Sequence, residues 1–325
     1  MQTLVLEGTM RSLSSVSHNG GQSFGISSKL RREKFVQLDG TVEEVPVISG
    51  NSIRGVLRDR SMLHMCKQLG YGVDEENGQV RGLTLPAFHF LFSGGALTSD
   101  GGKTIDLERA RTLRKLIPLV GVFGGAIGNM IMPGKLKMGK LIPICAETVH
   151  LLPDKQRPEA PQSIWEYLQE EMYTRKDDAK NEHYRPLIAQ SEKMLLESGM
   201  EEGSLLPDPK DSPATDGEHK QQMMYYVETF AAGTPFYWRI VLDDVTNIEF
   251  EAFLTGLAQF SKIPYIGGKS AVGLGEIAIN FDKWLSIDSR VQAASQEVNI
   301  PLGQAYYQHL QEQGGAIRAE LGRMK

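Results

Sequence analysis

Apolar and polar positions alternate near the start of the chain. Leu4, Leu6, Gly8 and Met10 fall on one side of this alternation, which predicts a strand over residues 3–13. Further along, the patterns predict a hairpin over 34–48, a helix over 51–69, a strand over 83–92, a helix over 105–117, a strand in the second half of 121–145, strands over 223–230 and 236–242, a helix over 248–260, a strand at the end of 267–281 and a helix over 302–322. This order of elements predicts an α+β domain built on an antiparallel sheet.

Residues 18–34 carry no such pattern. They are rich in glycine and serine and then become basic, so we expect a loop, and Asp39-Gly40 provides a turn for the hairpin that follows. Most charge runs are solvated loop surface. A basic run directly after a glycine-rich segment also suits an arm that contacts a nucleic-acid backbone.

Residues 153–222 differ in composition from the rest of the chain. They are polar, acidic and punctuated by prolines, and we expect helices only over 163–173 and near 186–198. We interpret 153–222 as a segment inserted into a domain formed by 1–152 and 223–325.

The net charge of the 325-residue chain is −5, which taken alone argues against a nucleic-acid partner. The acidity is concentrated, however. Residues 154–220 hold 16 acidic and 9 basic side chains, whereas the remainder holds 24 acidic and 26 basic ones. A local basic groove is therefore compatible with the composition.

The chain has two cysteines, no apolar run long enough to cross a membrane, and no signal-peptide pattern at its start. We expect a cytoplasmic protein without a membrane partner. The scattered histidines form no metal-binding motif, and neither a nucleophile elbow nor a converging carboxylate pair occurs, so we expect no metal, no cofactor and no catalytic residue.

The stretch VISGNSIRGVLRD, residues 47–59, places a Ser-Gly turn and two arginines at the start of a predicted helix. One interpretation is a capped helix with solvated arginines. The other is a phosphate site, because the first turn of a helix offers unpaired N–H groups and positive potential.

The glycine loop GGKSAVGLGEIAI, residues 267–279, also admits several interpretations. It lacks a glycine five residues before Gly268, which excludes a Walker loop, and its GxGxxA match precedes a strand instead of a helix, which argues against a dinucleotide site. A tight turn is the simplest interpretation. A loop whose amides face an RNA backbone, with Lys269 and Ser270 assisting, is the alternative.

Five segments, in this order, resemble the RAMP superfamily of CRISPR effector complexes, and in particular the backbone subunit that polymerises along guide RNA. They are HNGG at 18–21, VISGNSIRG at 47–55, FGG at 123–125, VETFAAGTPFYWRIVL at 227–242 and GGKSAVGLGEI at 267–277. The long acidic insertion and YTRKDDAKN at 173–181 make type IV the closest match, with type III related.

The resemblance implies a modified RRM-like, ferredoxin-like palm with an inserted thumb, stacked in many copies into a helical filament. The implied partners are CRISPR guide RNA, copies of the same chain, other effector subunits and complementary target nucleic acid. The residues that we therefore expect to contact RNA are His18, Asn19, Gly20, Lys29, Arg31, Arg32, Ser49, Gly50, Asn51, Ser52, Arg54, Arg58, Gly124, Gly125, Tyr173, Arg175, Lys176, Gly267, Gly268, Lys269 and Ser270. We expect the basic arm and both turns to line one electrostatic groove.

One departure from the family pattern bears on activity. Type III backbone subunits that cut target RNA carry an aspartate after the glycine pair, whereas this chain has Gly25-Ile-Ser-Ser-Lys29 there. We therefore expect a binder and not a nuclease. The alternatives are an RNA-cleaving subunit that uses Glu33 or Asp39, and, more distantly, an enzyme acting on a phosphate-bearing small molecule.

Overall fold

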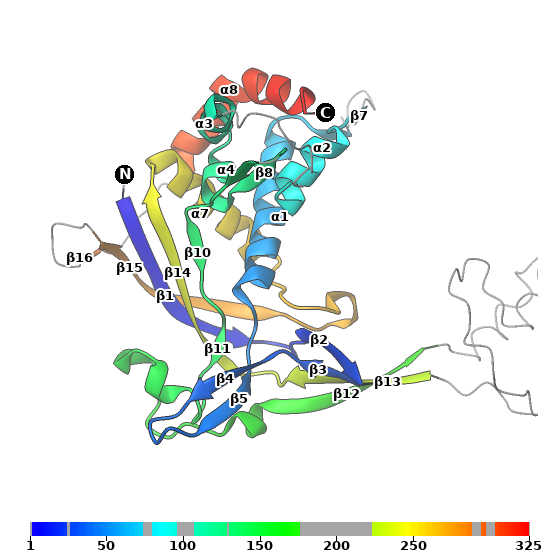
Figure 1. Cartoon of the computed structure of the whole chain (residues 1–325), viewed down its shortest axis with the longest axis vertical. Helices are drawn as coiled ribbons and strands as arrows, with labels where there is room; N and C mark the ends of the chain where they lie inside the picture. Colours follow the sequence, from blue (N-terminus) through cyan, green and yellow to red (C-terminus); the bar gives the residue numbers. More distant parts are fainter. Residues whose placement is uncertain are drawn as a thin grey trace, which may run out of the picture. The chain divides into compact units, whose positions relative to one another are not determined.

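The computed structural model describes residues 2–24, 27–73, 80–95, 107–128, 130–175, 223–287, 294–296 and 303–324. The chain forms two compact units. The larger comprises Met1–Gly21, Leu30–Gln169 and Thr229–Lys325, and the smaller comprises Gln22–Lys29 and Glu170–Glu228. The elements of each unit can be followed in Figure 1.

The larger unit is built on a six-stranded antiparallel sheet in the order β10-β14-β1-β15-β16, with β11 also paired to β14. Its strands are β1 (Gln2–Ser12), β10 (Leu136–Met138), β11 (Ile142–Pro143), β14 (Pro235–Val245), β15 (Ile277–Ile287) and β16 (Ala294–Gln296). Along the chain, β1, α1 (Gly50–Gln68), β10, β14, α7 (Asn247–Lys262) and β15 follow a β-α-β-β-α-β order. With β1 and β14 in the centre, this is the ferredoxin-like, RRM-like arrangement, so the predicted α+β class is confirmed.

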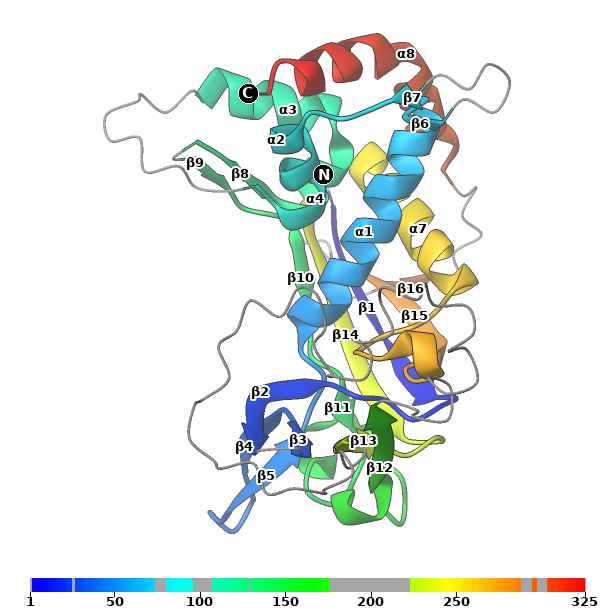
Figure 2. The same ribbon diagram turned by 90° about the vertical axis from the view of Figure 1, so that its right-hand side faces the viewer.

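Helices α1 and α7 pack against each other on one face of this sheet (Figure 2). Alternate residues of β1, including Leu6 and Met10, enter the core shared with these helices, and Trp238 of β14 is buried beside them. The other alternate positions, among them Thr9 and Arg11, lie on the opposite face of the sheet. That face is the one on which polar side chains are available.

Local sequence explains where the two helices begin. Ser49 caps α1, since its Oγ accepts from the N–H of Ser52 at 3.2 Å. Thr246 and Glu249 form a capping box at the start of α7, and Glu249 also pairs with Lys135 at 2.8 Å.

Short helices and a C-terminal helix complete the larger unit. They are α2 (Leu85–Phe88), the π-helical turn η1 (His89–Ser93), α3 (Leu107–Leu116), α4 (Pro118–Phe123) and α8 (Gln304–Gly322). The small pairs β6 (Gly72–Val73) with β7 (Val80–Arg81), and β8 (Gly125–Ile127) with β9 (Met130–Met132), lie among them, and the 3₁₀ turns η2 (Val149–Leu151), η3 (Asp154–Gln156) and η4 (Ile164–Tyr167) follow β11. The predicted helices over 51–69, 105–117, 248–260 and 302–322 are all present.

The predicted hairpin is also present. Strand β4 (Arg32–Val36) pairs with β5 (Val42–Pro46), and Gly40 adopts a φ of +85° in the turn. The Asp39 carboxylate accepts from both the N–H and the hydroxyl of Thr41, at 2.9 and 2.6 Å. Asp39 therefore serves the turn, as its position predicted.

The smaller unit contains strands of a second sheet in the order β12-β13-β3-β2, formed by β12 (Leu168–Arg175), β13 (Met223–Phe230), β3 (Ser27–Leu30) and β2 (Asn19–Phe24). Strand β13 runs parallel to β3, with Tyr226 opposite Ser27. The pairing joins segments that are about 200 residues apart in sequence, which no local pattern can predict.

Three secondary-structure predictions are wrong. The segment 18–34 is not a loop but supplies β2, β3 and the start of β4, because partners from elsewhere in the chain complete its hydrogen bonds. The stretch 83–92 is helical instead of extended, since Thr84 caps a turn with Pro86 in its first positions. Residues 163–173 form a 3₁₀ turn and then β12, which pairs with β13, and not a helix.

The boundaries expected for the insertion, 153–222, can be compared with the two units. Residues 153–169 cluster with the larger unit, whereas Glu170–Glu228 belongs to the smaller one. The helix expected near 186–198 and Lys176 lie outside the described residues.

Candidate nucleic-acid interface

Two of the quoted motifs meet just beyond the end of β1. Ser17 forms an isolated bridge with Gly268, whose N–H donates to the Ser17 carbonyl at 2.9 Å. Gly267 has a φ of +75°, and a Cβ at this position would overlap the same carbonyl. Gly267 is thus required for the close approach of two backbones, whereas a Cβ at Gly268 would meet nothing within 4 Å.

His18 links this junction to the start of α1. Its Nε2 accepts from the backbone N–H of Ser49 at 3.1 Å, and its carbonyl accepts from the N–H of Arg31 at 2.9 Å. The Arg31 carbonyl in turn accepts from the N–H of Val47 at 2.9 Å. The structure therefore brings the segments HNGG, VISGNSIRG and GGKSAVGLGEI together with part of the basic arm.

The imidazole of His18 is an acceptor and must be neutral at Nε2. Burial lowers the pKa of His18 below its ordinary value, and the positive charge of Arg31 lowers it further. The arrangement thus favours the protonation state that the contact with Ser49 needs.

The first turn of α1 is only partly available to an anion. The N–H groups of Ser49 and Ser52 already have partners inside the protein. Gly50 is buried, and a Cβ there would overlap the Met138 carbonyl, so its glycine is a packing requirement. Asn51 is exposed and Ser52 is half-buried, so these two residues present the accessible surface of the turn.

The two arginines of the motif are used inside the protein. Arg54 is half-buried, and its Nη2 donates to the carbonyl of Phe123. Arg58 is 7 % exposed, and its Nε and Nη2 donate to the carbonyls of Leu91, at 2.8 Å, and Gly124. Burial, and secondly the charge of Arg54, lowers the pKa of Arg58 to about 10.

The expectation that Arg58 contacts RNA is therefore corrected. Its guanidinium ties α1 to the chain around residues 91 and 124, and it lies over the Phe123 ring at 5.9 Å. Gly124 and Gly125 have packing roles in the same region, and their expected contact with RNA stays a prediction. A Cβ at Gly124 would lie 2.5 Å from the Met132 carbonyl, and one at Gly125 would lie 2.8 Å from the Phe90 ring.

The loop that follows Gly268 is exposed. Lys269 adopts a left-handed conformation, with φ +62° and ψ +31°, and begins the 3₁₀ turn η6 (Ser270–Val272). Its far end is held by Gly275, whose N–H donates to the Ser15 carbonyl at 2.7 Å. Strand β15 follows the loop, which agrees with the exclusion of a dinucleotide fingerprint.

Acidic partners offset much of the charge of the basic arm. In the smaller unit, Lys29 pairs with Glu170 at 2.5 Å and lies 4.0 Å from Glu228. In the larger unit, Arg31 lies 4.0 Å from Glu33, which also pairs with Lys140. Except for Glu33, these acidic partners are remote in sequence. The positive charge available on the basic arm is therefore smaller than the sequence alone indicated.

Other expected contacts have different surroundings. Arg32 lies over the ring of Trp165, with its Cζ 6.0 Å from the centroid. Asn19 and Gly20 are exposed at the start of β2. Tyr173 donates to Glu171 at 2.6 Å, and burial together with Glu171 raises the pKa of its phenol to about 12. Arg175 ends β12.

No described helix is long and apolar enough to cross a membrane. Both cysteines, Cys66 and Cys145, are buried and unpaired, and burial raises the pKa of each thiol to about 12.

Comparison with known proteins extends the fold assignment. No protein-family model matches the chain, and no curated protein matches it. Among solved structures, a chain of one described as a "Type IV-B CRISPR Complex" is similar over 93 % of this chain and 95 % of its own length, with 22 % identity and a TM-score of 0.52. At this identity the likeness shows that the two chains share a fold.

Proposed function

We propose that this protein is a guide-RNA-binding backbone subunit of a type IV CRISPR effector complex, and that it binds RNA without cutting it. The observation that carries the proposal is the convergence at the end of β1. Three segments separated by up to about 250 residues meet there through the contacts Ser17–Gly268 and His18–Ser49. These are three of the five segments on which the resemblance to the RAMP superfamily depends.

The fold supports the same proposal. A β-α-β-β-α-β palm is a platform that nucleic-acid-binding proteins use, and the chain shares its fold, across nearly its full length, with a chain of a Type IV-B CRISPR complex. Polymerisation along the guide, other effector subunits as partners, complementary target nucleic acid and a cytoplasmic location are parts of the proposal.

The proposed surface is smaller than the sequence indicated. It consists of the exposed positions around the junction, namely Asn19, Gly20, Asn51, Lys269 and Ser270, with the half-buried Ser52 and with Arg31 beside them. Backbone groups and hydroxyls outnumber cations in this set, which suits contacts with phosphate and sugar and little reading of base sequence.

Coexpression with a CRISPR array tests the proposal. We expect the purified protein to carry RNA of defined length, with a high ratio of absorbance at 260 nm to that at 280 nm, in elongated assemblies visible by electron microscopy. A matched culture without the array should yield no such assemblies. Protein that purifies free of RNA in both cultures would contradict the proposal.

The alternative of an enzyme acting on a phosphate-bearing small molecule predicts a different result. Nucleotides would then raise the melting temperature of the RNA-free protein, and coexpression with the array would change nothing.

A further inference from the structure

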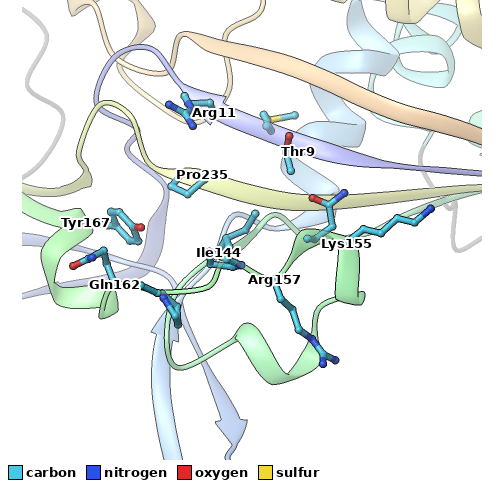
Figure 3. A pocket seen from close by; sticks show the side chains of 13 residues that line it. Thr9, Arg11, Ile144, Lys155, Arg157, Gln162, Tyr167 and Pro235 are labelled. Carbon is cyan, nitrogen blue, oxygen red and sulfur yellow. The ribbon is translucent and has the colours of Figure 1, made fainter.

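A pocket of about 370 Å³ lies at the end of β1 and the start of β14. Its walls come from the end of β1, the beginning of β14 and the segment that carries η3 and η4 (Figure 3). Its volume falls in the range of small-ligand pockets. None of the described residues that were expected to contact RNA lines it.

The walls of this pocket are tied together by backbone hydrogen bonds. The N–H of Ile144 donates to the Pro235 carbonyl at 2.9 Å, and that of Ala146 donates to the Gln162 carbonyl at 2.8 Å. The carbonyl of Tyr167 accepts from Ala231 at 2.8 Å. The lining side chains are therefore presented from a fixed frame, which lowers the entropic cost of binding.

The pocket carries positive charge without a matching carboxylate. Among the described residues, its lining includes Arg11, Lys155 and Arg157 and no aspartate or glutamate. Arg157 is committed to Asp154, at 2.9 Å, and to the Leu152 carbonyl. Arg11 and Lys155 have no ion-pair partner among the described residues.

The rest of the same sheet face is different. Arg239 pairs with Glu7 at 2.9 Å and Lys137 pairs with Asp243 at 2.6 Å. Arg239 and Lys137 are thus neutralised by neighbours, whereas Arg11 and Lys155 are available to an anion. In Figure 3, Arg11 and Lys155 come from separate segments and lie apart, so a ligand that meets both must extend from one to the other.

Neutral groups in the same pocket suit a base. The ring of Tyr167 and the amide of Gln162 lie together on one side, as Figure 3 shows. An aromatic ring offers a stacking surface, and an amide offers both a donor and an acceptor to a base edge. An acidic peptide would satisfy the cations but would leave these two groups without a role.

We propose that this pocket binds one nucleotide unit of a single-stranded nucleic acid, with Arg11 and Lys155 on its phosphates and Tyr167 and Gln162 at its base. The site is separate from the junction of Ser17, His18 and Ser49. That the natural strand is the guide or its target rests on the proposed function, whereas the nucleotide specificity of the pocket does not.

The test uses the full chain and the dinucleotide pUpU, titrated by calorimetry or by NMR. Arg11→Ala and Lys155→Ala should each weaken binding about tenfold, because each removes a charge-assisted contact with phosphate. Arg11→Gln keeps much of the side-chain volume and should lose as much affinity as Arg11→Ala. Lys137→Ala, a matched loss of charge on the same face, should leave the affinity unchanged.

Two further titrations identify the ligand class. Inorganic phosphate should bind at least tenfold more weakly than pUpU, and an oligoglutamate peptide should not displace bound pUpU. The proposal would be overturned if the protein did not bind pUpU, or if the Arg11 and Lys155 variants bound pUpU as tightly as the wild type does. It would also be overturned if phosphate bound as tightly as pUpU, or if the peptide displaced pUpU. A protein that binds pUpU as expected but forms no assemblies with array RNA would refute the proposed function and leave this site standing.

Discussion

The Nε2 atom of His18 accepts a hydrogen bond from the backbone N–H of Ser49 at 3.1 Å. The contact joins the first loop of the chain to the residue that caps α1. A protonated imidazole has no acceptor at Nε2, so the contact exists only while His18 is neutral. Protonation of the His18 ring therefore destabilises the contact between two of the converging segments.

The first prediction concerns acid stability. His18 has a lowered pKa in the folded protein, whereas its unfolded value is near the ordinary 6.5. The unfolded state then binds more protons, and the free energy of unfolding should fall as pH drops below about 6.5, until the folded pKa is reached. Urea unfolding midpoints between pH 7.5 and 5 measure this change, and His18→Gln should make the dependence shallower.

A second histidine provides the control for that experiment. Burial, followed by Lys262 and Lys67, also lowers the pKa of His64, so His64→Gln should remove a separate part of the same dependence. The double variant should be shallower than either single one. A His18→Gln profile parallel to that of the wild type would contradict the assignment.

The second prediction concerns Arg58. Arg58→Ala should lower the free energy of unfolding by about 2–4 kcal/mol, because it leaves two buried carbonyls without donors and opens a cavity. Lys67→Ala, on the exposed end of the same helix, should change stability by less than about 1 kcal/mol. Chemical denaturation measures both, and similar small losses would return Arg58 to the set of free cations.

The third prediction separates conformational strain from close packing. Gly40 and Gly124 both have positive φ, +85° and +71°. A Cβ at Gly40 meets nothing within 4 Å, whereas one at Gly124 lies 2.5 Å from a backbone oxygen. Gly40→Ala should cost about 1–2 kcal/mol of stability, and Gly124→Ala at least about 1 kcal/mol more. Equal unfolding midpoints for the two variants would contradict the packing role of Gly124.

Local sequence signals predicted the palm well. The cap at Ser49 and the apolar spacing of 51–69 belong to one short stretch, as do Thr246, Glu249 and the helix that they begin. The errors occurred where distant partners decide the outcome. Residues 163–173 have a composition that a helix tolerates, yet pairing with β13 makes most of them a strand.

The candidate site could likewise be predicted only in part. The motif residues could be identified from sequence, but their burial could not. Arg58 and Lys269 look alike in the sequence, and only the fold shows that the first is enclosed by the chain around Leu91 while the second is exposed. The cationic pocket could not be predicted from the sequence, because Arg11 and Lys155 lie in segments that are far apart along the chain.

The fourth prediction is that the protein does not cut RNA. Both carboxylates considered for cleavage have structural partners, since Asp39 accepts from Thr41 and Glu33 pairs with Lys140. Assembled complex incubated with labelled complementary RNA and Mg²⁺ should give no product on a denaturing gel. Regularly spaced fragments that disappear in Asp39→Ala or Glu33→Gln would overturn this prediction.

The fifth prediction concerns the salt dependence of RNA binding. Lys269 lies exposed in the loop that begins at the Ser17–Gly268 bridge, so on the proposed function its ammonium meets a phosphate. For single strands, each neutralised phosphate contributes about −0.7 to the slope of log affinity against log salt. Lys269→Ala should therefore make the slope shallower by about 0.7, for poly-U and for mixed sequences alike. Lys262→Ala removes another exposed cation, which contacts Gln259 on α7, and should leave the slope unchanged.

Melting temperatures of both variants should match the wild type, so that a change in slope reports contact and not folding. If the Lys269→Ala slope equals that of the wild type, the glycine loop only closes the fold, and the RNA surface must be sought away from this junction.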